Sequence, residues 1–222
     1  MKKISLEEVK KNPQVLQCIA ESDKSLDVLG YTEHGIRHVS LVAERAARIS
    51  DALGFDGEVR NRAEIASFCH DMGNFMGRTQ HHYWGALLFH QIFSETMDAH
   101  DCMKIVQAIA NHDKEEMKFT NPEAALVVIA DKSDVHRSRV RTQSIEETRK
   151  DIHDRVNYAT TFSDLVYDKE ADTIRLILSI DTEFVPIMEY FEIFTERMTY
   201  CRKAALYLGK SFGITINNIA ML

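Results

Sequence analysis

The sequence predicts a mainly α-helical fold with a β-hairpin and a long helix near its C-terminal end. Only nine glycines and three prolines occur among 222 residues, well below the roughly 12% that these two types usually supply. No glycine lies between Gly85 and Gly209. A chain with so few turn-forming residues is mostly helix, and apolar residues that recur at steps of three and four support this interpretation.

The first predicted helix begins after Gly35 and ends at Gly54. Its apolar face repeats at helical spacing and consists of His38, Val42, Ala46, Ile49 and Leu53. A second helix runs from Gly57 to Gly73, and Gly73 is placed to cap its C-terminal end.

Further helices are expected over residues 80–97 and 101–112. Another starts at Asn121, the predicted N-cap, with Pro122 at the first helical position. Its core-facing side consists of Ala124, Val128, Asp131 and Val135. A polar helix is predicted over residues 144–156.

The pattern changes near Tyr158. Residues 173–180 alternate between apolar and polar, which is typical of a half-buried strand. Residues 160–167 are rich in β-branched and aromatic side chains, and the polar segment 168–172 forms a turn between the two strands. A long helix is then predicted from Pro186 to Leu208, and residues 213–219 form a short closing strand.

The composition is that of a globular protein, with 45% apolar and 27% charged residues. No run approaches the roughly 18 apolar residues of a membrane span, and the acidic start is unlike a signal peptide. A net charge of −7 makes nucleic acid an improbable partner. The scattered cysteines are typical of reduced thiols, so we expect a cytoplasmic protein. A helical domain over 1–157 would carry residues 158–222 packed against it.

Potential metal ligands lie in line with core residues on several predicted helices. His38, His70 and Asp131 fall on apolar faces, and His112 shares a face with core isoleucines. A buried carboxylate costs folding free energy unless something pairs with it. For a single histidine, a hydrogen-bonded core side chain is the commoner explanation. Four such residues on separate helices are explained more economically by a shared cation.

The dipeptide His-Asp occurs at several places, so it is weak evidence by itself. The pairs are His70–Asp71, His100–Asp101, His112–Asp113 and His153–Asp154. Context selects the first pair, because it ends an apolar helix, follows His38 and precedes Asp131. The acids of the other pairs are expected to be solvated.

Three segments around these residues resemble the HD-domain metal-dependent phosphohydrolase superfamily. They are Gly35-Ile36-Arg37-His38-Val39-Ser40-Leu41-Val42-Ala43, Phe68-Cys69-His70-Asp71-Met72-Gly73 and Ile129-Ala130-Asp131-Lys132-Ser133-Asp134. The order His, His-Asp, Asp and the flanking Ala-Asp-Lys-x-Asp make the likeness specific, over about residues 30–140. It implies a helical bundle whose centre holds one or two divalent ions on His38, His70, Asp71 and Asp131.

Members of this superfamily with two metals carry two further histidines between the His-Asp pair and the last aspartate. The segment His81–Ala86 resembles the family's His-x-x-x-Gly-Ala and aligns His81 with the first of them, with His82 as the competing candidate. The segment Ala110-Asn111-His112 is similar to the one that carries the second. If both are ligands, Asp71 bridges the ions. One branch of the superfamily has a lysine that binds phosphate three residues after the motif aspartate. This chain has Asn74 at that position.

Imidazole and carboxylate ligands without thiolates suit Fe, Mn, Ni, Co or Zn, so we expect one or two of these divalent ions as cofactor. A bound divalent ion can lower the pKa of water from 15.7 to about 7. Because only neutral histidine binds a metal, affinity should fall as the pH drops through the histidine range.

Other charged residues are candidates for contacting a substrate. Lys132 follows the last ligand and either binds a substrate phosphate or forms a salt bridge with Asp134. Arg78 lies between the motif and His81, where it can reach the pocket mouth. His34 is an outer or third ligand, or an exposed residue at a helix start. A short basic run is more typical of a solvated face, and it consists of Arg137, Arg139 and Arg141.

We therefore expect a metal-dependent phosphohydrolase that cleaves a phosphomonoester or phosphoanhydride, with nucleotides as the leading substrate class. Asp71, His81 and His112 are the catalytic candidates, since the two histidines complete a second metal site or, with one ion, protonate the leaving group. A di-iron HD-domain oxygenase and a non-catalytic ligand-sensing module remain alternatives. A homodimer would cover the hairpin, which is marginal alone in water, but the final helix could equally cover it.

Overall fold

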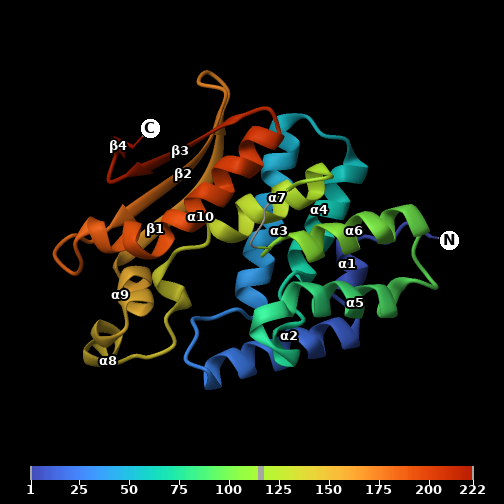
Figure 1. The fold of residues 1–222 in the computed structure, drawn as a ribbon, viewed down its shortest axis with the longest axis horizontal. Helices are drawn as coiled ribbons and strands as arrows, with labels where there is room; N and C mark the ends of the chain where they lie inside the picture. The colour runs from blue at the N-terminus through green and yellow to red at the C-terminus, as the bar shows by residue number, and fades with distance from the viewer. Residues whose placement is uncertain (1, 115–117, 222) are drawn as a thin grey trace.

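The computed structural model describes residues 2–114 and 118–221. It confirms a mainly α-helical fold with a small sheet near the C-terminal end (Figure 1). In that view α1, α2 and α4–α6 occupy one end of the molecule, the sheet and α10 occupy the other, and α3 and α7 lie between them. The α-helices are α1 (Leu6–Val9), α2 (Pro13–Val28), α3 (Ile36–Leu53), α4 (Gly57–Cys69), α5 (His81–Phe93), α6 (Ala99–Asn111), α7 (Pro122–Lys132), α8 (Ile145–Lys150), α9 (Ile152–Ala159) and α10 (Ile187–Tyr207).

Several predicted helix ends are confirmed by their caps. Gly54 ends α3 in the left-handed conformation, with φ at 77°, which suits glycine because it has no Cβ. The Asn121 side chain accepts a hydrogen bond from the Ala124 amide and so caps α7, in which Pro122 is the first residue. The helices α1 and α2 were not among the predicted elements, although Asn12 caps α2 in the same way.

Two predicted helix ends are wrong. Gly73 does not cap α4, because α4 ends at Cys69 and the φ of Gly73 is −93°. The polar helix over residues 144–156 is two helices, α8 and α9, separated at Asp151. The backbone of Asp151 is extended there, and its carboxylate accepts hydrogen bonds from the amides of His153 and Asp154. These bonds start a new helix rather than continue the old one.

The predicted hairpin is confirmed and belongs to a four-stranded sheet of order β1-β2-β3-β4. The strands are β1 (Thr160–Asp168), β2 (Thr173–Ile180), β3 (Ser211–Ile216) and β4 (Ile219–Ala220). The pairs β1–β2 and β3–β4 are antiparallel, whereas β2 and β3 are parallel. Parallel neighbours need a crossover connection, and α10 provides it. The closing strand is therefore real, although it starts at Ser211 rather than Gly213.

A continuous hydrophobic core joins the sheet to the helices. It contains Val42 of α3, Val128 of α7, Leu176 of β2 and Phe194 of α10, all essentially fully buried. Burial of a side chain such as Phe194 contributes roughly 1.5–3 kcal/mol, so α10 is held firmly against α7. The hairpin is thus covered by β3, which pairs with β2, and by α10, which shares its core. The homodimer and the domain boundary near residue 157 stay predictions.

A second core lies under the helices at the other end and includes Ile65, Phe68, Phe89 and Ile105. These residues come from α4, α5 and α6. Among the described residues, no helix combines the length and the apolar character needed to cross a membrane.

Candidate metal centre

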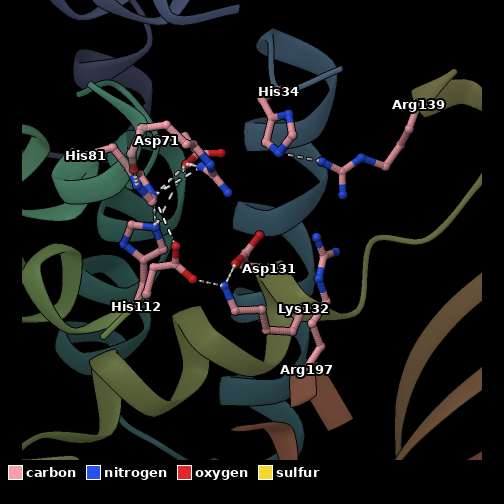
Figure 2. Close-up of a pocket in the computed structure, with 10 residues that line it drawn as sticks. His34, Asp71, His81, His112, Asp131, Lys132, Arg139 and Arg197 are labelled. Carbon is pink, nitrogen blue, oxygen red and sulfur yellow. Dashed lines mark hydrogen bonds and ion pairs between the residues drawn. The ribbon is translucent and has the colours of Figure 1, made fainter. Parts of the chain in front are cut away.

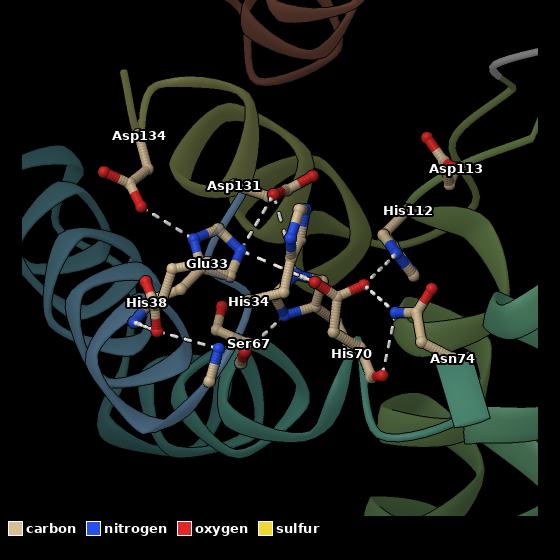
Figure 3. A network of polar contacts seen from close by, with 12 residues as sticks. Glu33, His34, His38, Ser67, His70, Asn74, His112, Asp113, Asp131 and Asp134 are labelled. Atoms are coloured by element: carbon tan, nitrogen blue, oxygen red, sulfur yellow. Dashed lines mark hydrogen bonds and ion pairs between the residues drawn. The ribbon is translucent and has the colours of Figure 1, made fainter. Parts of the chain in front are cut away.

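Three helices bring imidazole and carboxylate groups to one buried point between the two cores (Figure 3). His38 comes from α3, His70 directly follows α4, and Asp131 lies in the last turn of α7. The His38 Nε2 atom lies 3.6 Å from Asp71 Oδ2 and 3.4 Å from Asp131 Oδ1. The His70 Nε2 atom lies 3.3 Å from Asp71 Oδ2 and 3.6 Å from Asp131 Oδ1. Two ring nitrogens therefore converge with two carboxylate oxygens.

The hydrogen bonds of the two rings leave these nitrogens available to a cation. The Nδ1 atom of His70 donates to the Ser67 carbonyl at 2.6 Å, and the Nδ1 atom of His38 donates to the Asp134 carboxylate at 2.7 Å. With the proton on Nδ1, each Nε2 carries a lone pair. Both Nε2 atoms are buried without a hydrogen-bond partner. The donor set therefore fits a divalent cation.

A second group of ligands lies on the other side of Asp71. His81, the first residue of α5, donates from Nδ1 to the Arg78 carbonyl at 2.8 Å, and His112, just after α6, donates to the Ile109 carbonyl at 2.7 Å. Their Nε2 atoms are only 2.9 Å apart and lie 3.2 and 3.8 Å from Asp71 Oδ1. Two lone pairs at that distance repel unless a proton or a metal lies between them.

Asp71 therefore presents one oxygen to each group, and this arrangement fits a carboxylate that bridges two ions. The structure brings His81 to Asp71, whereas the His82 ring lies beside Tyr83, with centroids 4.2 Å apart. Among the described residues, the groups able to hold a metal ion include His81 and not His82. This geometry favours the alignment with His81.

The charges of the buried centre depend on one another. Burial would raise the pKa of Asp71 and Asp131, but His70 and Lys132 respectively hold these pKa values well below their ordinary range. Burial would lower the pKa of His70, yet Asp71 and Asp131 raise it to about 10. A proton on the His70 Nε2 atom and a cation therefore compete for the same position, because either one compensates the carboxylates.

Lys132 does not form the salt bridge with Asp134 that was one of its two expected roles. Its Nζ atom lies 2.8 Å from Asp113 and 2.9 Å from Asp131. Asp113, expected to be solvated, is therefore part of the site, and Lys132 holds its pKa below the ordinary value despite burial. Asp134 is instead fully buried against His38 and Arg37.

Above the ligands lies a pocket with a cationic wall (Figure 2). Four basic side chains line it together with Asp71, Asp113 and Asp131, namely Arg78, Lys132, Arg139 and Arg197. Lys132 and Arg78, the two candidates for contacting a substrate, both line this pocket, and their contact with a substrate stays a prediction. A cationic wall beside metal ligands suits an anionic ligand such as a phosphate.

Arg139 corrects the expectation that residues 137–141 form a solvated face, because only 2% of it is exposed. Its guanidinium donates to the carbonyls of Glu33 and Asp134 and to the His34 Nε2 atom, the last at 3.0 Å. The His34 Nδ1 atom donates to the Thr32 carbonyl at 2.6 Å. Burial and the nearby Arg139 keep the pKa of His34 low. His34 is thus buried rather than exposed, with both ring nitrogens occupied.

Sequence reasoning missed three residues that the structure places in the pocket. Asp113 had a signal, since it completes a second His-Asp pair beside His112. Arg139 had a weaker sequence signal, namely its place in the basic run of residues 137–141. Arg197 had none, because it lies about sixty residues beyond the last motif, on α10.

Comparison with known families identifies residues 35–136 as a match to the HD domain. The matched segment contains both groups of candidate ligands and Lys132, and it excludes Arg139, the sheet and α10. Comparison with curated proteins found no match.

Proposed function

The chain belongs to the HD-domain superfamily through residues 35–136, and on this premise we propose that it is a metal-dependent phosphohydrolase. Its substrate would be a phosphomonoester or phosphoanhydride, with a nucleotide as the leading class. One observation carries the proposal: His and Asp ligands converge at the floor of a pocket whose wall is basic. Metal ligands beneath a basic wall are the parts that phosphoryl transfer requires.

The ligands would act through the atoms that the structure leaves available. His38 and His70, with Asp71 and Asp131, would hold one divalent ion, and Asp71, His81 and His112 would hold a second. Such ions make bound water more acidic and polarise a phosphoryl oxygen. Lys132, oriented by Asp113 and Asp131, would contact a phosphate oxygen. Arg78, half-buried and only 3.8 Å from Asp71 Oδ1, would contact another.

The basic wall also weighs against the alternatives. Oxygen activation by two irons uses the same ligand types but has no need of four basic side chains around them. A ligand-sensing module needs no available Nε2 lone pairs. A phosphate ester that is to be cleaved accounts for both the available Nε2 lone pairs and the basic wall. The His and Asp residues would hold the metal beside its phosphorus, and the basic side chains would neutralise its oxygens.

The test is hydrolysis of a panel of nucleotides and simple phosphate esters by protein that is first stripped with a chelator. Activity should be absent after chelation and return with one of Mn, Fe, Co, Ni or Zn. Asp71→Asn should lack both metal and activity, while Asp51→Asn, on the exposed side of α3, should behave as wild type. No turnover of any substrate with any of these metals would contradict the proposal.

A further inference from the structure

Arg197 brings a guanidinium into the pocket from outside the HD match. Its side chain rises from α10 toward the space between Asp131 and Arg139 (Figure 2). The guanidinium lies 4.8 Å from the centre of the Phe194 ring. Within residues 2–114 and 118–221, neither a hydrogen-bond acceptor nor a carboxylate at ion-pair distance is found for it.

The other basic groups of the wall are already engaged by the protein. Lys132 is held between two carboxylates, Arg139 donates to backbone carbonyls, and Arg78 donates to the Asn74 side chain at 2.9 Å. Arg197 keeps all five of its N–H donors. Arg197 is only partly exposed, and an anionic ligand would supply the hydrogen-bond acceptors that the described residues do not offer it.

Arg197 also lies where two cavities meet. The pocket above the metal ligands and an outer cavity of about 210 Å³ share His34, Arg78, Arg139 and Arg197 in their walls. The outer cavity extends toward Tyr31 and Asn157. A phosphate seated over Asp71 and Asp131 would occupy the inner pocket, so a substituent of that phosphate would pass the arginines on its way outward.

We propose that Arg197 binds a second anionic group of the substrate, next to the phosphate at the metal ligands. The substrate is then a phosphoanhydride or diphosphate rather than a simple monoester. A planar guanidinium can donate two parallel hydrogen bonds to phosphate oxygens, and Arg78 at the same passage adds a second cation. This inference rests on the proposed function, since it assumes that a phosphate lies over the ligands.

Two probes that cannot be hydrolysed separate one anionic group from two. Methylphosphonate carries one phosphonate, and methylenediphosphonate carries two joined by carbon. Calorimetric titration of the metal-loaded full chain should show that wild type binds methylenediphosphonate at least about tenfold more tightly. Arg197→Gln should lose about tenfold in affinity for methylenediphosphonate and change by less than about twofold for methylphosphonate.

Matched variants and a folding check make the result specific. Arg202→Gln removes an exposed arginine of the same helix and should bind both probes as wild type does. Arg197→Lys should recover part of the lost affinity. The thermal unfolding of Arg197→Gln should occur near the wild-type temperature, because the guanidinium loses only its contact with the Phe194 ring.

Four outcomes would overturn the inference. If Arg197→Gln lowered the affinity for both probes equally, Arg197 would act only as a general positive charge. If the affinity for neither probe fell, Arg197 would not contact the ligand. Equal affinity of wild type for both probes would contradict the second anionic group while leaving the hydrolase proposal to the substrate panel. Failure of wild type to bind either probe would contradict both proposals.

Discussion

The Asp134 Oδ2 atom lies 2.7 Å from the Nδ1 atom of His38, and both side chains are fully buried. The same oxygen accepts a hydrogen bond from Arg37 at 2.8 Å. Burial would raise the pKa of Asp134, but Arg139 and His38 hold it well below its ordinary value. Asp134 therefore acts as a carboxylate that fixes the His38 tautomer and directs its Nε2 atom toward Asp71 and Asp131.

Replacing Asp134 by asparagine should weaken metal binding without removing a ligand. Partners that orient a ligating histidine typically contribute about 10–100-fold in metal affinity, so we expect a loss of that size for Asp134→Asn. Competition with a chelator of known affinity measures it. Glu44→Gln, which changes an exposed acid on α3, the helix of His38, should leave the affinity unchanged. An unchanged affinity in Asp134→Asn would contradict the assigned role.

The choice between His81 and His82 can be made by counting bound ions. His81→Ala should lose one of the ions that wild type holds, because its Nε2 atom lies 3.2 Å from Asp71 Oδ1. His82→Ala should keep the wild-type metal content. Elemental analysis of both purified variants, with thermal unfolding to establish that each is folded, gives the answer. The reverse pattern would assign the ligand to His82.

Gly73 is required because two backbone segments approach each other there. A Cβ atom at this position would lie 2.3 Å from the His81 carbonyl oxygen and 2.4 Å from the Gly85 amide nitrogen. Gly73→Ala must therefore push α5 away from the His70–Asp71 turn, and we expect a loss of at least roughly 1–3 kcal/mol in unfolding free energy.

The control for this variant is Gly57→Ala, because a Cβ at this position would meet no atom within 4 Å beyond the adjacent residues and the backbone of its own helix. It should be neutral or slightly stabilising, since alanine favours a helix over glycine by up to about 1 kcal/mol. Denaturant titration measures both variants. If Gly73→Ala were as stable as wild type, the close approach of α5 to this turn would be wrong.

Lys132 should matter for the substrate rather than for the fold. Its ammonium lies between Asp113 and Asp131 at the pocket wall, and its loss leaves both carboxylates facing an incoming phosphate. We expect Lys132→Gln to lower kcat/KM by about tenfold or more while retaining metal. Lys24→Gln, an exposed lysine of α2, is the matched control. Wild-type kcat/KM in Lys132→Gln would exclude contact with substrate.

The sequence could predict those parts of the fold and site that depend on local patterns. The cap at Asn121 and the alternation over residues 173–180 are local, and both match the structure. His38, His70 and Asp131 stood out because a polar residue repeats in step with a core face, and such residues must share an interior partner.

Other features depend on contacts between distant segments, which periodicity does not encode. Gly73 looked like a helix cap, but its requirement comes from α5 packing across the turn. Asp151 divides a polar helix through hydrogen bonds that compete with helix continuation. Arg197 enters the pocket only because α10 packs on α7, and nothing in its immediate sequence distinguishes it from a surface arginine.

The parallel pairing of β2 with β3 has a mechanical consequence for the pocket. Because α10 joins these neighbouring strands, both of its ends are anchored, and sliding it along its axis would break strand hydrogen bonds. The distance between Arg197 and the carboxylates of the site is therefore fixed by the fold. Ligands would be sorted by the length between their charged ends, with little accommodation from the protein.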